Sequence, residues 1–440
     1  MRGNVIMKNY QLLSTFKYGS NGHSSLSEEE INAEYLHRIN DYSATVTAMF
    51  PRLVNKESLE MGILNGKSVA KFNDPIFWMV TPKILMLLDT VRKQSAEISA
   101  LIYTNKIPTV AINSYTYSML TNEIFFSNEI EGVHTNPEEI STIVWDTDTK
   151  VDNKHRRLES TIRQYKASLQ ANQRQINNLS DFRQIYDQLL EGEISKDSLP
   201  DVNIIRDSFV YIGRQNNTVH LPPDNEQDIS LALSQLITFM NNDDDVIPIV
   251  KAIVTHFMFE NTHPFRDGNG RMGRYLLSSY LSNKLDVFTG LSISTSIHTH
   301  VQNYYRLFRD AGNSENRAEL TLFIEGMLEI IADGQTEVLN QFSLRMQTLQ
   351  NGLEKLKQKL PDMNDDESNI LYIFLQSKLF TSSGTTDGIT DNELGEFIKE
   401  NSNISRRKFK DIVKKYTGNG VLKTIKRKPL QHILNSEYIN

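Results

Sequence analysis

Apolar residues three and four positions apart dominate the hydrophobic pattern of this chain, which predicts a mainly α-helical protein. The pattern predicts helices over residues 28–50, 82–103, 114–130, 154–190 and 319–360. The last stretch is interrupted only by Gly334 and Gly352. Two further helices are predicted to begin at Pro137, which follows Asn136, and at Pro248, because proline is favoured in the first helical turn.

One segment has a β pattern instead. Residues 208–221 contain two β-prone runs on either side of a Gly/Asn-rich turn, and Pro222 and Pro223 follow the second run. This arrangement predicts a β-hairpin attached to the helical body.

The C-terminal part begins after a polar, acidic stretch at 362–368, which indicates a domain boundary. Thr390 is placed to cap a helix over 391–400, and Ser405 is placed to cap a second helix over 406–416. A Gly-Asn-Gly turn and a β-prone run follow. Between residues 405 and 428 the sequence has ten Lys or Arg and a single acid, Asp411.

Composition narrows the function classes. At 440 residues the chain is too long for one ordinary core, so we expect about two to three domains. The absence of cysteine excludes disulfides, thiolate metal sites and a cysteine nucleophile. The net charge of -7 gives no global attraction to nucleic acid or anionic membranes. With no signal-peptide pattern and no apolar run of transmembrane length, we expect a cytoplasmic protein without a membrane anchor.

Candidate chemistry concentrates in residues 263–274, between two helical patterns. The glycines on either side of Asn269 permit positive φ angles and close approach of backbone N–H groups to an anion at a helix N-terminus. Arg271 and Arg274 add guanidinium groups on one helical face. These features predict a phosphate-binding turn.

Two further side chains add reactive groups to this turn. Asp267 offers a hard oxygen ligand suited to Mg²⁺, and His263 can take up a proton near neutral pH. A Gly-Asn-Gly turn alone is most often an ordinary turn, and a lone histidine is usually structural. The histidine, acid, glycines and arginines of residues 263–274 occur together at fixed spacing. This combination favours a site that holds a nucleotide polyphosphate while a base activates an incoming hydroxyl.

The same register resembles the motif of the Fic family, H-x-F-x-[D/E]-G-N-G-R-x-x-R, at every fixed position. The resemblance extends over about residues 110–345 and implies a Fic-type helical core. It also implies that the hairpin at 208–221 is a flap that pairs with an extended segment of a target protein by strand addition. Residues 294–307, with Tyr304 and Tyr305, resemble the helix that follows the active site in this family.

The resemblance implies a protein adenylyltransferase that uses ATP and Mg²⁺ (or Mn²⁺). His263 would be the general base for a target Ser, Thr or Tyr hydroxyl, and Asp267 would bind the metal. The hydroxyl attacks the α-phosphorus, pyrophosphate leaves, and AMP stays on the target. Phe265 would anchor the loop, and Arg274 would reach the γ-phosphate. The implied nucleotide-binding residues are Phe265, Gly268, Asn269, Gly270, Arg271 and Arg274.

An upstream helix end resembles the inhibitory motif of the same family, [S/T]-x-x-x-E-[G/N]. Ser127 and Glu131 lie four residues apart, and Gly132 is placed to end the helix. The resemblance implies that Glu131 pairs with Arg274 and takes the place of the γ-phosphate. Taken alone, this segment is an ordinary helix end.

The C-terminal residues resemble a winged helix-turn-helix, with a recognition helix at 405–416 and a wing at 420–428. The excess of Lys and Arg over acidic residues in 405–428 suits binding to DNA phosphates, although a solvated basic helix explains it as well. The implied organisation is an N-terminal helical region at 1–110, a Fic core at 111–345 with an inhibitory helix at about 114–132, a helical linker at 346–361 and an α+β winged helix-turn-helix domain at 362–440.

Alternatives remain open at the level of the sequence. The same site can work in reverse and remove AMP from a modified protein, or the chain can be a DNA-binding regulator with a secondary Fic core. Self-modification and a homodimer are also left open. His298 and His300 are a weak metal pair because no third ligand is in register, and His256 is expected to be a core histidine.

Overall fold

The computed structural model describes residues 10–18, 25–70, 73–103, 107–146, 158–170, 175–195, 198–200, 204–214, 217–242, 246–381, 390–427 and 430–439. The chain divides into two compact units. Unit 1 consists of residues 1–93 and 164–334, and unit 2 consists of residues 94–163 and 335–440. The divisions fall inside the helices α4 (Pro82–Tyr103), α7 (Glu159–Leu169) and α15 (Thr321–Lys359).

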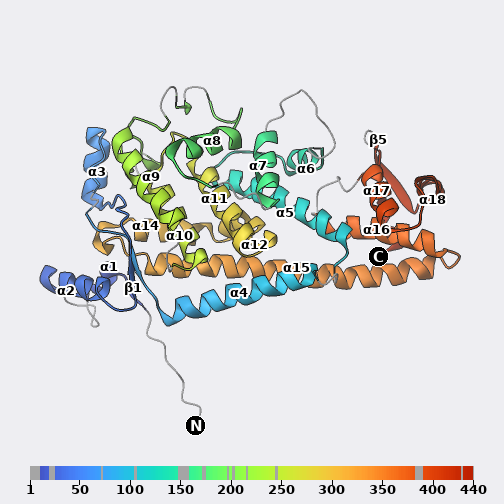
Figure 1. The fold of residues 1–440 in the computed structure, drawn as a ribbon, viewed down its shortest axis with the longest axis horizontal. Helices are drawn as coiled ribbons and strands as arrows, with labels where there is room; N and C mark the ends of the chain where they lie inside the picture. The colour runs from blue at the N-terminus through green and yellow to red at the C-terminus, as the bar shows by residue number, and fades with distance from the viewer. Residues whose placement is uncertain are drawn as a thin grey trace, which may run out of the picture. The chain divides into compact units, whose positions relative to one another are not determined.

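Unit 1 is mostly helical and carries two short antiparallel strand pairs (Figure 1). Besides its parts of α4, α7 and α15 it contains α1 (Leu13–Phe16), α2 (Glu28–Ile39), β1 (Ala44–Val46), α3 (Lys56–Asn65), β2 (Phe77–Met79), α8 (Leu179–Leu189), β3 (Ile212–Arg214), β4 (Asn217–His220), α9 (Glu226–Asn241), α10 (Pro248–Thr262), α11 (Asn269–Lys284), α12 (Val287–Leu291), α13 (Ile293–Thr299) and α14 (Val301–Ala311).

Unit 2 is also mainly helical and ends in a third strand pair. Besides its parts of the three shared helices it contains α5 (Thr109–Ile130), α6 (Pro137–Asp146), α16 (Asp365–Phe380), α17 (Asp391–Asn401), α18 (Arg406–Gly418), β5 (Leu422–Arg427) and β6 (Leu430–Leu434). The mainly α fold class predicted from the sequence is therefore confirmed.

Most of the predicted helices occur where their periodicity places them. The helices predicted over 82–103 and 114–130 are confirmed as α4 and α5, although α5 begins earlier, at Thr109. Pro137 and Pro248 begin α6 and α10 as expected. The helix predicted over 319–360 is confirmed as α15, which passes through both glycines without a break. A Cβ at Gly334 would lie 2.3 Å from Ser296 Oγ, so that glycine permits close packing of α13.

Three predicted helices have the wrong extent. The helix expected over 28–50 ends at Ile39, and residues 44–46 form β1, which pairs with β2. The helix expected over 154–190 is two helices, α7 and α8, because the Asn178 side chain accepts from the Asp181 N–H and starts a new helix. Residues 154–157 and 171–174 lie outside the described residues. The helix expected over 294–307 is divided at His300 into α13 and α14.

The predicted hairpin is confirmed as the antiparallel pair β3 and β4, with Ile212 opposite His220 and Gly213 opposite Thr218. Residues 215 and 216, at its turn, lie outside the described residues. The hairpin is a two-stranded sheet, so it offers sheet edges to which a further strand can bind. This geometry is compatible with the expected flap, whose pairing with a target remains a prediction.

The helices predicted in the C-terminal part are also confirmed. Thr390 and Glu393 form a capping box at α17, and the Ser405 side chain accepts from the Lys408 N–H at the start of α18. Strands β5 and β6 follow and pair antiparallel. Whether residues 362–440 form a winged helix-turn-helix remains a prediction. The limits of the three predicted regions and of the linker between the last two also remain predictions.

The helix pair α10 and α11 places the predicted phosphate turn. The two helices pack against each other, and α9 packs against α10 (Figure 1). Buried aromatic side chains, including Phe257, Phe259 and Phe265, fill the core beside the connection between them. The connection at residues 263–268 is therefore held on a packed helical base. None of the helices in the described ranges is long and apolar enough to cross a membrane.

Candidate active site

His263 ends helix α10 in a strained backbone conformation. Its φ of 48° and ψ of 62° lie in the left-handed region, which is uncommon for a residue other than glycine. Its N–H still donates to the Phe259 carbonyl at 2.9 Å and closes the last helical turn. The chain therefore leaves α10 sharply at His263, and such strained positions cluster at functional sites.

The loop after His263 is closed by one asparagine side chain. The Phe265 N–H donates to Asn269 Oδ1 at 2.9 Å, and Asn269 Nδ2 donates back to the Phe265 carbonyl at 2.8 Å. Phe265 is fully buried, and its ring stacks on Tyr186 with centroids 3.8 Å apart. The sequence prediction that Phe265 anchors the loop is consistent with this packing. The amide of Asn269 shapes the loop, so Asn269 can contact a phosphate through its backbone rather than its side chain.

Gly268 makes the start of α11 possible. It is the N-cap of the helix, with a φ of 82°, and a Cβ at this position would lie 2.3 Å from Leu190 Cδ1. The first N–H groups of a helix have no intrahelical acceptor, and the helix dipole adds positive potential there. The turn therefore presents the backbone donors that the sequence predicts for a phosphate group.

Two arginines stand at the first turns of α11. Arg271 is buried, donates to Glu193 Oε2 at 3.1 Å, and lies 3.6 Å from Asp267 Oδ1. Its Nε is buried and has no acceptor among the described residues, so this guanidinium retains a donor. Arg274 is 1% exposed, and its charge adds to desolvation in lowering the pKa of His256.

Burial keeps the catalytic candidate neutral. Desolvation, with Arg206 and His220 nearby, lowers the pKa of His263 to about 3, although part of the residue remains solvent-accessible. Its Nδ1 is buried without a hydrogen-bond partner among the described residues. Because the imidazole is unprotonated at pH 7, it can accept a proton rather than donate one. A bound polyphosphate adds negative charge, which raises the proton affinity of such a group.

Asp267 fits the role of a metal ligand that works together with a substrate. Its side chain is 57% exposed, so its carboxylate can reach a ligand above the loop. The described residues contain no cluster of three or more His, Cys, Asp or Glu that could hold a metal ion. Mg²⁺ is commonly bound through one or two carboxylates together with substrate phosphates. Asp267 would hold the ion only in company with a nucleotide, where the ion would neutralise phosphate charge.

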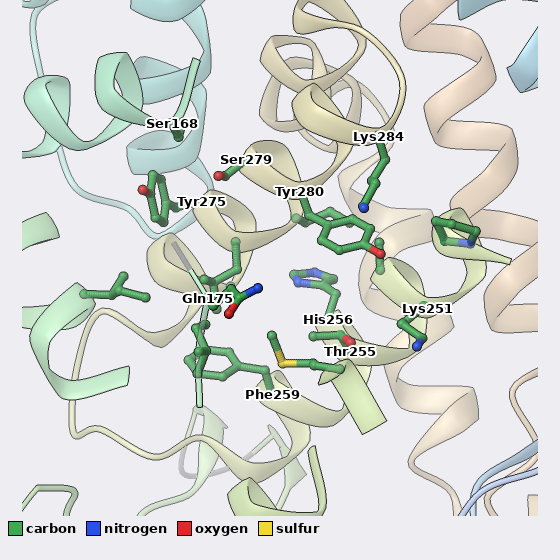
Figure 2. Close-up of a pocket in the computed structure, with 18 of the residues that line it drawn as sticks. Ser168, Gln175, Lys251, Thr255, His256, Phe259, Tyr275, Ser279, Tyr280 and Lys284 are labelled. Carbon is green, nitrogen blue, oxygen red and sulfur yellow. The ribbon is translucent and has the colours of Figure 1, made fainter. Parts of the chain in front are cut away.

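A cavity of about 770 Å³ lies beside the same helices but away from the catalytic candidates. Figure 2 shows His256, Lys251 and Tyr280 around it. Neither His263 nor Asp267 lines this cavity. A smaller cavity of about 370 Å³ reaches the end of α10. The larger cavity therefore does not include these two catalytic candidates, although Gly273 of α11 lines it.

The remaining candidates from the sequence lie apart from this site or have structural roles. His256 is buried and its Nε2 is 2.8 Å from the Tyr304 hydroxyl, which confirms a core histidine. His300 lies 3.2 Å from Asp333, and no metal cluster forms around it among the described residues.

The inhibitory candidates lie at the end of α5 in unit 2. Gly132 has a φ of 70° and donates to the Glu129 carbonyl, while the Val133 N–H donates to the Asn128 carbonyl. This Schellman pattern confirms that Gly132 ends the helix, with Glu131 as the C-cap. Ser127 is buried on the same helix. Their inhibitory role remains a prediction.

Sequence reasoning missed several residues that build the site. Arg206 bonds to the backbone at His263, His220 bonds to the carbonyl of Asn261, and Glu193 holds Arg271. Their partners lie tens of residues away, so no local spacing marks the pairs. The one available signal was the apolar Ile205 before Arg206, which is buried in the structure.

Fold and site together define a class: a mainly helical protein whose helix–turn–helix segment presents a neutral imidazole beside a glycine-containing turn at a helix N-terminus. Residues 175–281 match the Fic/DOC family, and this stretch includes the turn. Residues 175–281 are therefore similar to the Fic/DOC family, in agreement with the motif resemblance.

Individual relatives match at different lengths. A protein of Aquifex aeolicus named "Probable protein adenylyltransferase" is 41% identical over 46 residues, which are 10% of this chain and only 14% of that protein. A Fic family protein from Desulfovibrio desulfuricans has a TM-score of 0.48 and 19% identity, covering 81% of this chain and 97% of that chain. A fragment of Fic-1 from C. elegans has a TM-score of 0.42 and 16% identity, covering 59% and 73%.

Proposed function

We propose that this protein transfers AMP from ATP to a Ser, Thr or Tyr hydroxyl of a target protein, releasing pyrophosphate. The observation that carries the proposal is the turn between α10 and α11, which combines a neutral His263 with the N-terminal amides of α11 and the guanidinium of Arg271. The name of the Aquifex aeolicus relative supports an adenylyltransferase reaction.

The proposed reaction assigns one task to each group. His263 takes the proton of the incoming hydroxyl as its oxygen bonds to the α-phosphorus and the bond to the leaving pyrophosphate breaks. Backbone N–H groups at the start of α11 and the Arg271 guanidinium hold the phosphates, so charge that develops on them is stabilised. Asp267 would hold Mg²⁺ on the phosphates. The proton then leaves His263 for solvent, which restores the neutral base.

The decisive experiment is mass spectrometry of the full chain incubated with MgATP, alone and with cell lysate. We expect the added mass of AMP on a hydroxyl residue of this chain or of a captured protein. His263→Ala should lower the rate at least ~100-fold, the usual contribution of a general base. His298→Ala, at an exposed position outside the turn, is the matched control and should leave the rate unchanged. An active His263→Ala protein would remove His263 from the proposed role.

We also propose that Glu131 restrains this activity, on the basis of the sequence motif. A carboxylate competes with phosphate for the same guanidinium, so a bound Glu131 would exclude the γ-phosphate from Arg274. The same residues can serve the reverse reaction, with a water replacing the hydroxyl. Release of AMP from a modified target in the absence of ATP would favour that reverse reaction over transfer.

A second function, DNA contact through residues 405–428, is favoured by the surface of α18. Arg407, Lys410 and Lys414 are exposed and lie three and four residues apart, on one helical face. Within the described part of unit 2, no carboxylate forms an ion pair with these three side chains. Other basic residues of the helix are already paired: Arg406 with Glu396, Lys408 with Asp366 and Lys415 with Glu367.

Fluorescence anisotropy of the full chain with duplex DNA over a salt series tests this second function. We expect affinity to fall as salt rises, because Lys and Arg displace counterions from DNA phosphates. Arg407→Ala should reduce the slope of log affinity against log salt by about one. Arg406→Ala, whose partner is Glu396, is the control and should reduce it less. Binding that is absent, or independent of salt, would contradict DNA contact.

A further inference from the structure

Three consecutive carbonyl groups at the end of α10 accept hydrogen bonds from both ends of the hairpin segment. On one side, Arg206 Nε donates to the His263 carbonyl at 2.8 Å and Nη2 donates to the Thr262 carbonyl at 3.4 Å. On the other side, His220 Nε2 lies 2.8 Å from the Asn261 carbonyl. Hydrogen bonds thus connect both ends of the hairpin segment to the end of α10, where His263 lies.

Arg206 makes the larger share of these contacts. Its Nη1 donates to the Ser208 carbonyl at 2.6 Å, and its own N–H donates to the Pro264 carbonyl at 3.0 Å. The side chain is only 2% exposed. Arg206 therefore links the chain just before β3 to both sides of the strained His263, through its buried guanidinium at Thr262 and His263 and through its main-chain N–H at Pro264.

The chemistry of these contacts suits a fixed connection rather than a ligand site. The last carbonyls of a helix lack intrahelical donors, and the negative end of the helix dipole favours a cation there. Arginine offers five N–H donors in a planar fork, so it can satisfy several carbonyls at once. Lysine has a compact ammonium group and cannot reproduce that fork.

We propose that Arg206 is a positioning residue that holds the hairpin at residues 212–220 and the turn at His263 in one fixed arrangement. This inference rests on the proposed function in one respect: the hairpin is where a target segment would bind. Under that assignment, Arg206 sets the distance from the incoming hydroxyl to the imidazole. Misplacement of reacting groups by about 1 Å can lower a rate by ~100-fold.

The charge of Arg206 also acts on the imidazole of His263. Desolvation is the largest cause of the lowered pKa of His263, and the positive charge of Arg206 is the next. His220 and a backbone contact at Glu260 are the other groups that act on His263. Removal of the Arg206 charge should therefore raise the pKa of His263, whereas removal of the fork alone should not.

The test compares Arg206→Gln and Arg206→Lys with Arg92→Gln, an exposed position on α4. Two readouts need no catalysis: amide hydrogen exchange of residues 212–220, and NMR titration of the His263 imidazole. We expect exchange to accelerate about tenfold or more in both Arg206 variants. The pKa of His263 should rise in Arg206→Gln only, because the lysine variant keeps the positive charge. Arg92→Gln should behave as the unchanged chain.

AMP transfer is the third readout and separates this inference from the proposed function. We expect kcat to fall by ~100-fold in Arg206→Gln and by about tenfold or more in Arg206→Lys, with the KM for ATP nearly unchanged. If the unchanged chain and Glu131→Gly transfer no AMP, the proposed function fails, while hydrogen exchange still decides the positioning role. If Arg206→Gln does not fold, Arg206→Lys decides. Wild-type hairpin protection and transfer in a folded Arg206→Lys protein would overturn the inference.

Discussion

At the scale of single residues, the turn after α10 depends on side chains that shape the backbone more than on side chains that face a ligand. Asn269 bonds to both polar groups of Phe265, and Gly268 adopts a φ of 82° against Leu190. Their removal would displace the helix N-terminus to which an anion would bind. The motif thus encodes the shape of the loop as well as its charges.

Gly268→Ala should therefore destabilise the fold. The new Cβ would lie 2.3 Å from Leu190 Cδ1 and would occupy a left-handed backbone, so we expect a loss of about 2 kcal/mol or more in the free energy of unfolding. Gly418→Ala, where a Cβ meets nothing within 4 Å and φ is not left-handed, is the matched control. Urea denaturation of both variants checks the prediction. Equal stabilities would show that the turn tolerates a side chain at Gly268.

Sequence alone located the motif residues because they are close in the chain. Twelve residues in fixed register suffice to place His263, Asp267 and Arg274 on one turn and one helix start. The contacts that support them could not be predicted in this way. Arg206 is 57 residues from His263, and Glu193 is 78 residues from Arg271. Such pairs form only once the helices pack.

At the scale of elements, helix starts were the most predictable feature. Helix starts are marked by Thr390 and Ser405, which cap α17 and α18, and by Pro137 and Pro248, which begin α6 and α10. Each of these residues suits the first helical turn through local chemistry. Strands β1 and β2 were missed. Each has three residues, too few for an alternating pattern, and their pairing joins residues 44–46 to residues 77–79.

The end of α5 supports a prediction about regulation. Its Schellman pattern fixes Gly132 and leaves Glu131 as the helix C-cap, which is the carboxylate that the inhibitory motif specifies. Glu131→Gly should raise AMP transfer by roughly 5–150-fold, the range of a coupling free energy of about 1–3 kcal/mol. Labelling with radioactive ATP measures the change.

The control for this prediction removes a neighbouring carboxylate. Glu129→Ala changes the same helix end but occupies a variable position of the motif, so it should leave labelling near the level of the unchanged chain. An equal rise in both variants would point to general loosening of α5. No rise in Glu131→Gly would count against a restraint by this residue.

At the scale of the whole molecule, unit 1 is built around neutral histidines. Desolvation lowers the pKa of His220 to about 4, that of His256 to about 3 and that of His263 to about 3. Two of them bond through Nε2, His220 to the Asn261 carbonyl and His256 to the Tyr304 hydroxyl. Protonation of either ring places an uncompensated charge in a packed interior.

This arrangement gives the stability a defined dependence on pH. In the unfolded chain these histidines titrate near pH 6.5, and in the folded chain they titrate near pH 3 to 4. Between those values the unfolded chain binds more protons, so stability is full above pH 6.5 and falls as the pH decreases. Each group contributes a slope of up to about 1.4 kcal/mol per pH unit in that window.

His256→Gln tests the sign of this linkage directly, since glutamine keeps a hydrogen-bonding group but takes up no proton. We expect the variant to be less stable than the unchanged chain at pH 7, because the packing around Tyr304 is disturbed. The stability difference should then shrink as the pH is lowered to 5, since only the unchanged chain loses stability through this ring. Urea denaturation at pH 7, 6 and 5 measures both curves. Parallel curves would show that the fold does not hold His256 neutral. The interior of unit 1 would then contain a charged imidazole beside Arg274.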